Sequence, residues 1–306
     1  MIFMLSSKPV YYIDRKTNTK KKEAIYGGTL LSLLYANNIF SKLLSYAVAH
    51  ITLISRFYGF WQKMPYTKKN IAPFVAKFNI DYSEFEKSLD QFSSFNDFFC
   101  RKLKKNARPL SGGQNCIVAP ADGRYLVIPQ ISTAKGFYIK GHTFSLETLL
   151  QDTSLAQDYQ EGSMVIARLC PTDYHRFHFP IEGEATTTKL INGPLFSVNP
   201  IAAAKNVHIF SENKRMITLL ENTPFDTIVY IEVGATNVGS IIQTYTPNSH
   251  VNKGDEKGFF SFGGSSLILL FKPNTLLFDQ DLINNSSQHL ETLILMGSSL
   301  GRLKNS

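Results

Sequence analysis

The chain has 306 residues, enough to bury a sizeable core as one large domain or two smaller ones. A hydrophobic content of 43% with 18% charged residues excludes a largely disordered chain. No phosphate-binding glycine loop and no dinucleotide fingerprint occurs in the sequence. The three cysteines form no Cys-x-x-Cys pair, which favours a reducing compartment and argues against a metal site.

The net charge of +8 is unevenly distributed. Residues 1–70 contain eleven Lys or Arg against Asp14 and Glu23, so this part alone carries +9 and the remainder is close to neutral. Such polarity indicates an anionic partner for the N-terminal part, either a membrane surface or a nucleic acid. The aromatic residues there lie within an apolar stripe and match no recognisable nucleic-acid module, so we expect a membrane and no nucleic acid.

The first predicted helices follow a polar, lysine-rich stretch at residues 1–23. That stretch does not resemble a signal peptide, because the apolar residues come late and no small-residue cleavage site follows them closely. Between residues 24 and 61 apolar side chains recur at near-helical spacing, but the charge-free part, 43–55, is too short to cross about 30 Å of hydrocarbon. We expect an amphipathic helical pair in the membrane interface, with Trp61 near the headgroups. The alternative is a helical hairpin packed on the protein's own core.

A short helix is predicted next. Ser83 and Glu86 have capping-box spacing, and Phe85, Leu89 and Phe92 follow at i, i+4 and i+7. Residues 94–103, which contain Phe-Asn-Asp-Phe-Phe, should then present an apolar helix face that docks the N-terminal helices onto the rest of the chain.

After about residue 110 the sequence becomes strand-like, with β-branched runs bounded by Gly, Pro, Asn or Asp. The predicted strands are 117–119, 125–128, 164–169, 217–220, 227–233 and 239–244, with one helix at 145–150. Residues 276–303 are expected to form a polar tail with a closing strand at 292–296. The pattern predicts an α+β fold: a basic, helical, membrane-associating region at 1–92 and a β-rich, largely antiparallel catalytic domain at 93–306.

Three segments carry the residue types of a hydroxyl nucleophile, its base and a supporting carboxylate. Ser265 follows two glycines and precedes an apolar run, 267–271, that predicts a buried strand. Asp122 lies in a Pro-Ala-Asp-Gly turn, and His178 in Tyr-His-Arg-Phe-His-Phe-Pro. Taken alone, the serine could belong to a simple turn and the aspartate could cap its own backbone. His175 lies three residues before His178: a strand would place the two on opposite faces, whereas a turn would bring them together.

In this order, the segments resemble signatures of the phosphatidylserine decarboxylase family. The matches are Phe-Asn-(acidic)-Phe-Phe at 95–99, Pro-Ala-Asp-Gly at 120–123, Lys-Gly-His at 140–142, Tyr-His-Arg-x-His-x-Pro at 174–180, Gly-x-Leu-Phe-Ser-Val-Asn at 193–199, Val-Gly-Ala-x-x-Val-Gly-Ser at 233–240, Lys-Gly-x-Glu at 253–256 and the Gly-Ser pair at 264–265. The resemblance covers residues 95–271, and the first 90 residues match only in being basic and apolar-helical.

The resemblance implies a precursor that cuts itself. Ser265 would attack the carbonyl of Gly264, with His178 as base and Asp122 in support. The products would be a β chain of residues 1–264 and an α chain of residues 265–306, which remain associated, with Ser265 converted to a pyruvoyl group. That ketone would act as electron sink while phosphatidylserine loses CO2 to give phosphatidylethanolamine, so no diffusible cofactor is implied.

Further implications are less direct. His175, His142, Phe196 and Ser197 are assigned to substrate handling. Members of the family commonly carry Thr after the reactive serine, so Ser266 is an alternative nucleophile. A peripheral position on the cytoplasmic face of a bacterial membrane is favoured over an organellar membrane, because no Arg- and Ser-rich presequence occurs.

Other interpretations remain at this stage. A homodimer is left open. The first rival function is a serine hydrolase, although the Gly-x-Ser-x-Gly motif is absent. The second is a membrane-anchored binding module without activity, in which residues 263–266 form only a turn.

Overall fold

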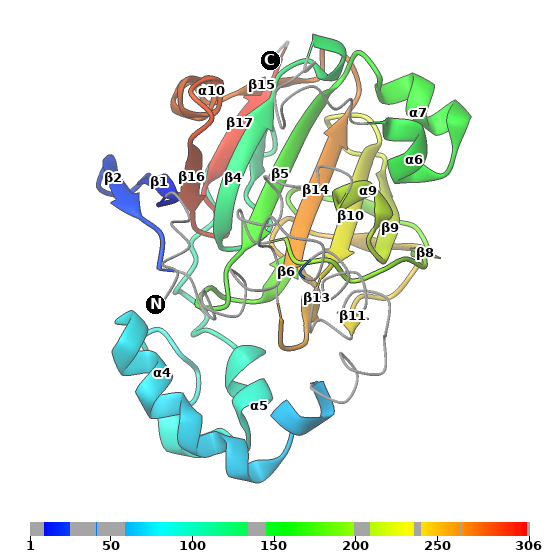
Figure 1. Ribbon diagram of the computed structural model, residues 1–306. Helices are drawn as coiled ribbons and strands as arrows, with labels where there is room; N and C mark the ends of the chain where they lie inside the picture. The colour runs from blue at the N-terminus through cyan, green and yellow to red at the C-terminus, as the bar shows by residue number, and fades with distance from the viewer. Residues whose placement is uncertain are drawn as a thin grey trace.

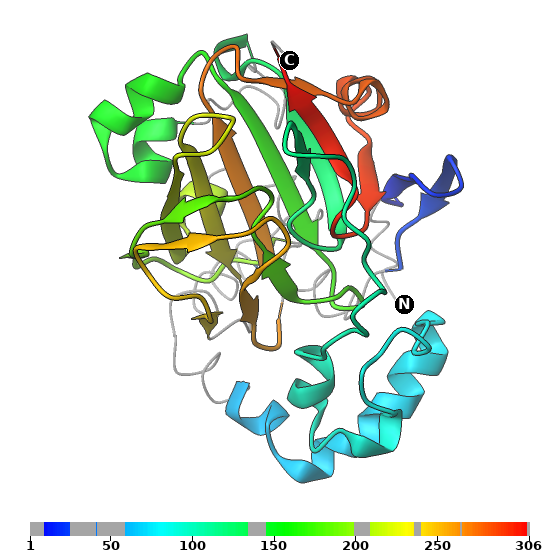
Figure 2. The same ribbon diagram turned by 180° about the vertical axis from the view of Figure 1, so that it is seen from behind.

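A computed structural model describes residues 9–24, 41, 59–133, 145–198, 209–235, 240–263 and 265–304 (Figure 1). A large twisted sheet runs through the main body, with smaller sheets on one face and helices on the other (Figures 1 and 2). Most of the predicted helical pair at 24–61, the Lys-Gly-His segment at 140–142 and Gly264 lie outside the described residues. No helix in the described ranges is long and apolar enough to cross a bilayer.

The large sheet is antiparallel except where β1 meets β16. In spatial order its strands are β12 (Ser249–Val251), β7 (Gly183–Ala185), β9 (Arg215–Glu221), β10 (Ile228–Gly234), β14 (Ser265–Phe271), β5 (Ser163–Leu169), β4 (Gly123–Ile128), β16 (Glu291–Ile294), β1 (Tyr11–Asp14) and β2 (Thr19–Lys22), and β8 (Lys189–Ile191) pairs with β9. The smaller sheets are β11 (Ile241–Gln243), β13 (Glu256–Phe260) and β6 (Arg176–His178), and β15 (Leu276–Phe278), β17 (Ser299–Leu303) and β3 (Cys116–Val118). The predicted β-rich, largely antiparallel α+β class is confirmed.

Strand β14 is buried along its whole length between β10 and β5. Because side chains alternate along a strand, Leu267 and Leu269 pack into the core beneath the smaller sheets, whereas Ile268 and Leu270 face the second core. That second core lies under α6 (Leu146–Leu150), α7 (Thr153–Tyr159) and α9 (Ile209–Glu212). The same alternation directs the two serines at the start of β14 to opposite faces of the sheet.

A helical region lies beside the lower end of the sheet in Figure 1. It contains η1 (Pro65–Asn70), α4 (Ile71–Phe78), η2 (Leu89–Gln91) and α5 (Phe95–Phe99). Ser94 caps α5 by accepting a hydrogen bond from the backbone N–H of Asp97. The aromatic face of α5 joins a cluster that also buries Phe262, just before Ser265. The docking role predicted for residues 94–103 is confirmed for α5.

The predicted helix that starts at Ser83 is wrong. Only the short 3-10 turn η2 forms, and Ser88, not Ser83, begins it by donating its backbone N–H to Gln91. Tertiary contacts override the local helical pattern: Phe85 bridges to Leu103, and the carboxylate of Glu84 accepts from Arg108 at 2.7 Å.

The two ends of the chain contain more structure than their composition predicts. Residues 11–22 form the β1–β2 hairpin, and residues 276–303 form β15, α10 (Gln280–Ser287), β16 and β17 instead of a polar tail with one strand. These elements are short, and each is stabilised by a sheet partner that is distant in sequence, so no local periodicity announces them. The remaining short element is η3 (Ile131–Thr133).

Candidate active site

Three of the motifs meet around strand β6. The backbone N–H of His178 donates to the carbonyl of Pro120 at 2.8 Å, which joins the Pro-Ala-Asp-Gly turn to this strand. On its other side β6 pairs with β13, placing Glu256 opposite His178, and Phe179 donates to the carbonyl of Asp255 at 2.9 Å. Segments separated by more than 130 residues therefore form one site.

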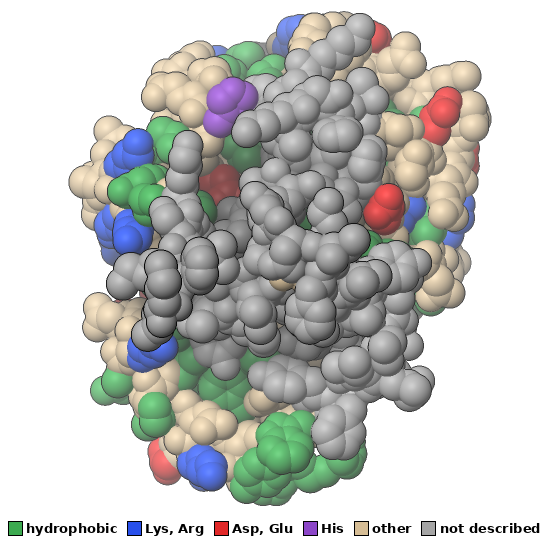
Figure 3. All heavy atoms as spheres, in the orientation of Figure 1, with side chains coloured by type: hydrophobic (Ala, Val, Ile, Leu, Met, Phe, Trp, Pro, Cys, Tyr) green, Lys and Arg blue, Asp and Glu red, His purple; other side chains and the backbone are tan. Residues whose placement is uncertain are grey.

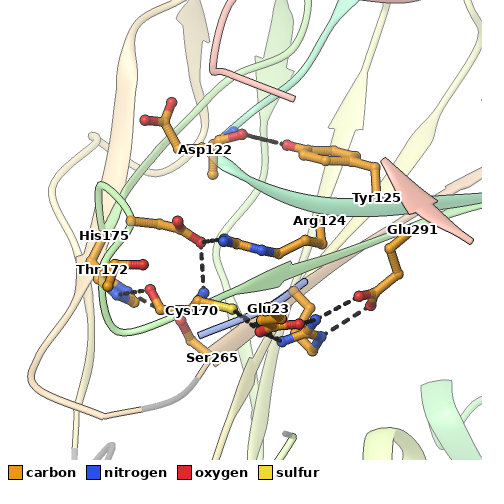
Figure 4. Close-up of polar contacts among 12 residues, drawn as sticks. Glu23, Asp122, Arg124, Tyr125, Cys170, Thr172, His175, Ser265 and Glu291 are labelled. Carbon is orange, nitrogen blue, oxygen red and sulfur yellow. Dashed lines mark hydrogen bonds and ion pairs between the residues drawn. The ribbon is translucent and has the colours of Figure 1, made fainter. Parts of the chain in front are cut away.

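Ser265 begins the central strand β14. The register places it opposite Leu169 on β5 and Gly234 on β10, and it is fully buried. Its Oγ lies 3.4 Å from Nδ1 of His175, so the side chain in contact with the serine is the first histidine of the motif and not the second. Figure 4 shows the two residues in this part of the site.

His175 is held in one orientation by two contacts. Its ring stacks on Phe99 with centroids 3.8 Å apart, and its Nε2 lies 3.0 Å from the carbonyl oxygen of Cys170. Because a carbonyl can only accept, Nε2 carries the hydrogen, and the lone pair of Nδ1 is directed at Ser265. The imidazole is thus arranged to accept a proton from the serine hydroxyl.

The surroundings also keep this imidazole neutral. Burial lowers the pKa of His175 well below its usual 6.5, and the positive charge of Arg101 lowers it further. Arg101 is itself buried and donates to the carbonyls of Thr172 and Asp173. A base in this environment is unprotonated at neutral pH without help from a carboxylate.

His178 faces a different space. Its Nδ1 donates to the carbonyl of Gly254 at 3.0 Å, so Nε2 accepts from the hydroxyl of Tyr174 at 3.1 Å. The ring lines a pocket of about 320 Å³ together with Arg108 and Met296. Burial lowers its pKa as well. Of the two arrangements considered for the histidine pair, the strand arrangement is the one found.

Asp122 lies next to this pocket. Its carboxylate accepts from Arg108 Nη2 at 2.7 Å and Nε at 2.9 Å, and from the backbone N–H of Met296 at 2.8 Å. Within the described residues no hydrogen bond joins Asp122 to His178 or His178 to Ser265. The structure therefore brings Ser265 to His175, and it places Asp122 and His178 on the neighbouring pocket.

Comparison with known proteins decides the family. The family model described as phosphatidylserine decarboxylase matches residues 95–302. A Chlamydia felis protein named phosphatidylserine decarboxylase proenzyme is 50% identical, over 96% of this chain and 98% of its own length. Proteins of the same name from Chlamydia muridarum and Chlamydia pneumoniae are each 48% identical, over 97% and 95% of this chain and 99% and 96% of their own lengths.

The chain belongs to the phosphatidylserine decarboxylase family. This confirms the resemblance stated from the motifs, and with it the prediction of a phosphatidylserine-decarboxylating enzyme over a serine hydrolase or an inactive binding module. The relatives extend the likeness further than the motifs did, because their alignments include most of the N-terminal part as well.

Other predicted site residues of this decarboxylase lie on the opposite face of β14. Ser266 is buried, and its Oγ has no hydrogen-bond partner among the described residues. Phe196 is fixed by Asn213, whose side chain bonds both backbone groups of Phe196 and also the carbonyl of Gly234. Ser197 follows in the same segment. His142 and Gly264 are outside the described residues.

Three residues that support His175 were not predicted as site residues. Phe99 and Arg101 belong to the Phe-Asn-Asp-Phe-Phe segment and its continuation, so the motif pointed to the right place with a purely structural role. Cys170 carries no signal, because its contribution is a backbone carbonyl, which every residue possesses.

Proposed function

We propose that this decarboxylase is made as a precursor that cuts itself between Gly264 and Ser265, and that the pyruvoyl group so formed decarboxylates phosphatidylserine to phosphatidylethanolamine. The observation that carries the proposal is the 3.4 Å approach of Ser265 Oγ to the unprotonated Nδ1 of His175 in a buried site. Since Ser265 is fully buried, its own hydroxyl is a better placed nucleophile than water.

The first step is an acyl shift within the chain. His175 Nδ1 takes the hydroxyl proton while Ser265 Oγ bonds to the carbonyl carbon of Gly264. The Gly264–Ser265 C–N bond then breaks, and the proton passes to the departing nitrogen, which leaves an ester between the two residues. Loss of the Cα proton of Ser265 then breaks the Cβ–O bond and releases the carboxylate of Gly264. Water replaces the nitrogen of the resulting enamine, which leaves as ammonia, and a ketone remains.

Such a ketone supplies an electron sink for decarboxylation of an amino acid bound through its amine. The chain's own residues fit a group at this position: Ser265 is anchored in the central strand, its surroundings are dry, and a neutral imidazole lies beside it. The base assigned by family resemblance was His178, with Asp122 in support. The contacts favour His175 as base, and we assign His178 to the substrate, because it lines the neighbouring pocket.

We propose that the two fragments stay together. The fragment that starts at Ser265 contributes β14, which is hydrogen-bonded on both sides to strands of the other fragment, β10 and β5. It also contributes β16 and β17, which pair with β4 and β3. Separation would break the central sheet and expose the apolar residues of β14, so cleavage of one bond is not enough to release it.

We propose peripheral attachment to an anionic bilayer through the N-terminal part. Just before α4, three large aromatic side chains, Phe60, Trp61 and Tyr66, are exposed by 58%, 47% and 46%. Figure 3 shows hydrophobic side chains gathered at that lower end of the molecule. Lysines of the same stretch are Lys63, Lys68 and Lys69. Exposed aromatics beside lysines are suited to a headgroup layer of negative charge.

Mass spectrometry of the purified protein tests cleavage. We expect fragments 1–264 and 265–306, the second with a ketone in place of its amino terminus, and CO2 release from carboxyl-labelled phosphatidylserine that borohydride abolishes. A single uncut chain that releases no CO2 would refute the proposal. Cleavage that leaves an unmodified serine terminus would refute the pyruvoyl step.

Flotation with vesicles tests the membrane proposal. Binding should require phosphatidylserine and should fall on Trp61→Ala. The matched control is Leu277→Ala, which removes a similarly exposed apolar side chain, 41% exposed, from β15. Equal loss of binding in both variants, or equal binding to phosphatidylcholine vesicles, would contradict this attachment.

A further inference from the structure

Cys170 is held at each of its polar atoms. Its backbone N–H donates to Asp173 Oδ2 at 2.7 Å, its carbonyl accepts from His175 Nε2 at 3.0 Å, and its thiol donates to Glu23 Oε1 at 2.7 Å. The carbonyl is the group that fixes the hydrogen of His175 on Nε2. The position of Cys170 therefore determines where the lone pair of His175 points.

Glu23 reaches this position from the other end of the chain. It follows strand β2 and is buried, with its side chain 2% exposed. Its two oxygens accept from Arg168 Nη1 at 2.9 Å and Nη2 at 2.7 Å, and Glu291 binds another edge of the same guanidinium at 3.0 and 2.5 Å. Figure 4 marks these contacts with dashed lines. Arg168 lies opposite Ser266 in the β5–β14 register, so this ion network lies directly beside the start of β14.

The charges in this network are fixed. Burial alone would raise the pKa of Glu23, but the adjacent guanidinium of Arg168 outweighs it and lowers the pKa to about 2. Burial raises the pKa of the Cys170 thiol, so the thiol keeps its proton and is the donor to Glu23. A charged carboxylate thus holds a neutral thiol in place, with Arg168 balancing the charge.

We propose that Glu23 is a positioning residue for self-cleavage. Through the thiol of Cys170 it fixes the carbonyl that orients His175 toward Ser265, so the site is complete only when residues 11–23 have docked on the sheet. Premature cutting of an unfinished chain is thereby avoided. The inference rests on the proposed self-cleavage and adds a requirement to it.

The alternative is that Glu23 only fastens the N-terminal hairpin. The hairpin has a second attachment that allows the two roles to be separated. Arg15 binds Asp279 at 2.8 Å and Asp281 at 2.7 Å on the far side of β1, with no contact to Cys170. Arg15→Ala therefore weakens docking of the same hairpin and leaves the Glu23–Cys170 contact in place.

The experiment measures the cleavage rate of newly made full-length chain in a cell-free translation time course. Glu23→Gln, which keeps the shape and loses the charge, should slow cleavage at least about tenfold, the size of effect typical when a partner that orients a functional histidine is lost. Arg15→Ala should stay within about twofold of the parent even though it lowers the melting temperature. If Glu23→Gln cuts as fast as the parent, or if the two variants slow cleavage in proportion to their loss of stability, the positioning role is refuted.

A second pair decides the matter if Glu23→Gln does not fold. Cys170→Ala removes the donor to Glu23, whereas Cys170→Ser restores one, so the serine variant should cut faster than the alanine variant. Equal rates would refute the role.

A spectroscopic readout is independent of cleavage. In the Ser265→Ala precursor, ¹⁵N NMR of labelled histidine should show His175 as a single Nε2-protonated tautomer, and Glu23→Gln should mix the tautomers. An unchanged spectrum would refute the inference. If the parent chain does not cut itself at all, the proposed function fails, and the spectrum still reports on the Glu23 contact.

Discussion

The two histidines of the Tyr-His-Arg-Phe-His segment have the same side chain and opposite surroundings. His175 is fully buried, stacks on Phe99 and directs a lone pair at Ser265. His178, three residues later, lines a pocket and is bonded to Tyr174 and to the carbonyl of Gly254. A strand separates them, because alternation sends neighbouring side chains to different faces.

This difference shows that one short motif can serve two compartments of a site. The dry side holds the bond to be cut, where exclusion of water favours attack by a side chain. The pocket side has a guanidinium, that of Arg108, and space for a ligand. We therefore expect changes on the His175 side to affect self-cleavage first, and changes on the His178 side to affect the decarboxylation that follows.

The largest effect should come from the two serines. Ser265→Ala should leave an uncut 306-residue chain, because the hydroxyl that faces His175 is gone. Ser266→Ala should still be cut, since its side chain lies on the opposite face of β14. Intact-mass measurement of both proteins checks this, and an uncut Ser266→Ala protein beside a cut Ser265→Ala protein would reverse the assignment.

The histidine pair tests the comparison itself. His175→Gln should slow self-cleavage by about 100-fold or more, the usual contribution of a general base. His178→Gln should be cut at a rate near that of the parent and lose decarboxylase activity instead. The measurements are the cleavage time course and CO2 release by the mature form. The family-based assignment of His178 as base predicts the reverse result, so the two variants separate the hypotheses directly.

Much of the fold could be predicted from the sequence, because the six predicted strand runs after residue 110 are apolar and bounded by turn residues. The chain ends were missed for a physical reason. β1, for example, is only half buried and forms because β16 offers it a parallel partner almost 280 residues away. Pairing of this kind is a property of the assembled sheet and leaves no local pattern.

The site was predictable in its parts list and not in its pairing. Motifs identified Asp122, His175, His178 and Ser265, yet which imidazole meets the serine depends on the path of the chain from Cys170 to β6. The bonds that decide it run from backbone carbonyls, those of Cys170 and Gly254, which no residue pattern encodes. The sequence also suggested Asp122 as the partner of a histidine, whereas the carboxylate is taken by Arg108.

The pH dependence of cleavage sharpens the contrast between a buried base and an exposed one. The pKa of His175 is lowered well below 6.5 by burial and by Arg101, so the base stays neutral as the pH falls through that range. We expect the rate constant to change by less than about twofold between pH 8 and pH 6.5, where an exposed histidine would already be half protonated. A slow-cutting Ser265→Thr precursor, purified and then transferred to each pH, permits the measurement. A midpoint near 6.5 would place the base in an exposed position.

The smallest effect concerns the aromatic ring that supports the base. Phe99→Leu keeps an apolar side chain in the cluster and removes the stacking on His175, which is worth about 0.5–1.5 kcal/mol. If that energy serves to orient the imidazole, cleavage should slow by roughly two- to tenfold. Phe92→Leu is the matched control, since Phe92 belongs to the same cluster and contacts Phe85 and Phe98 instead of His175. Comparable melting temperatures with different cleavage rates would assign the effect to orientation, whereas equal slowing in both variants would show that the helical region contributes only stability.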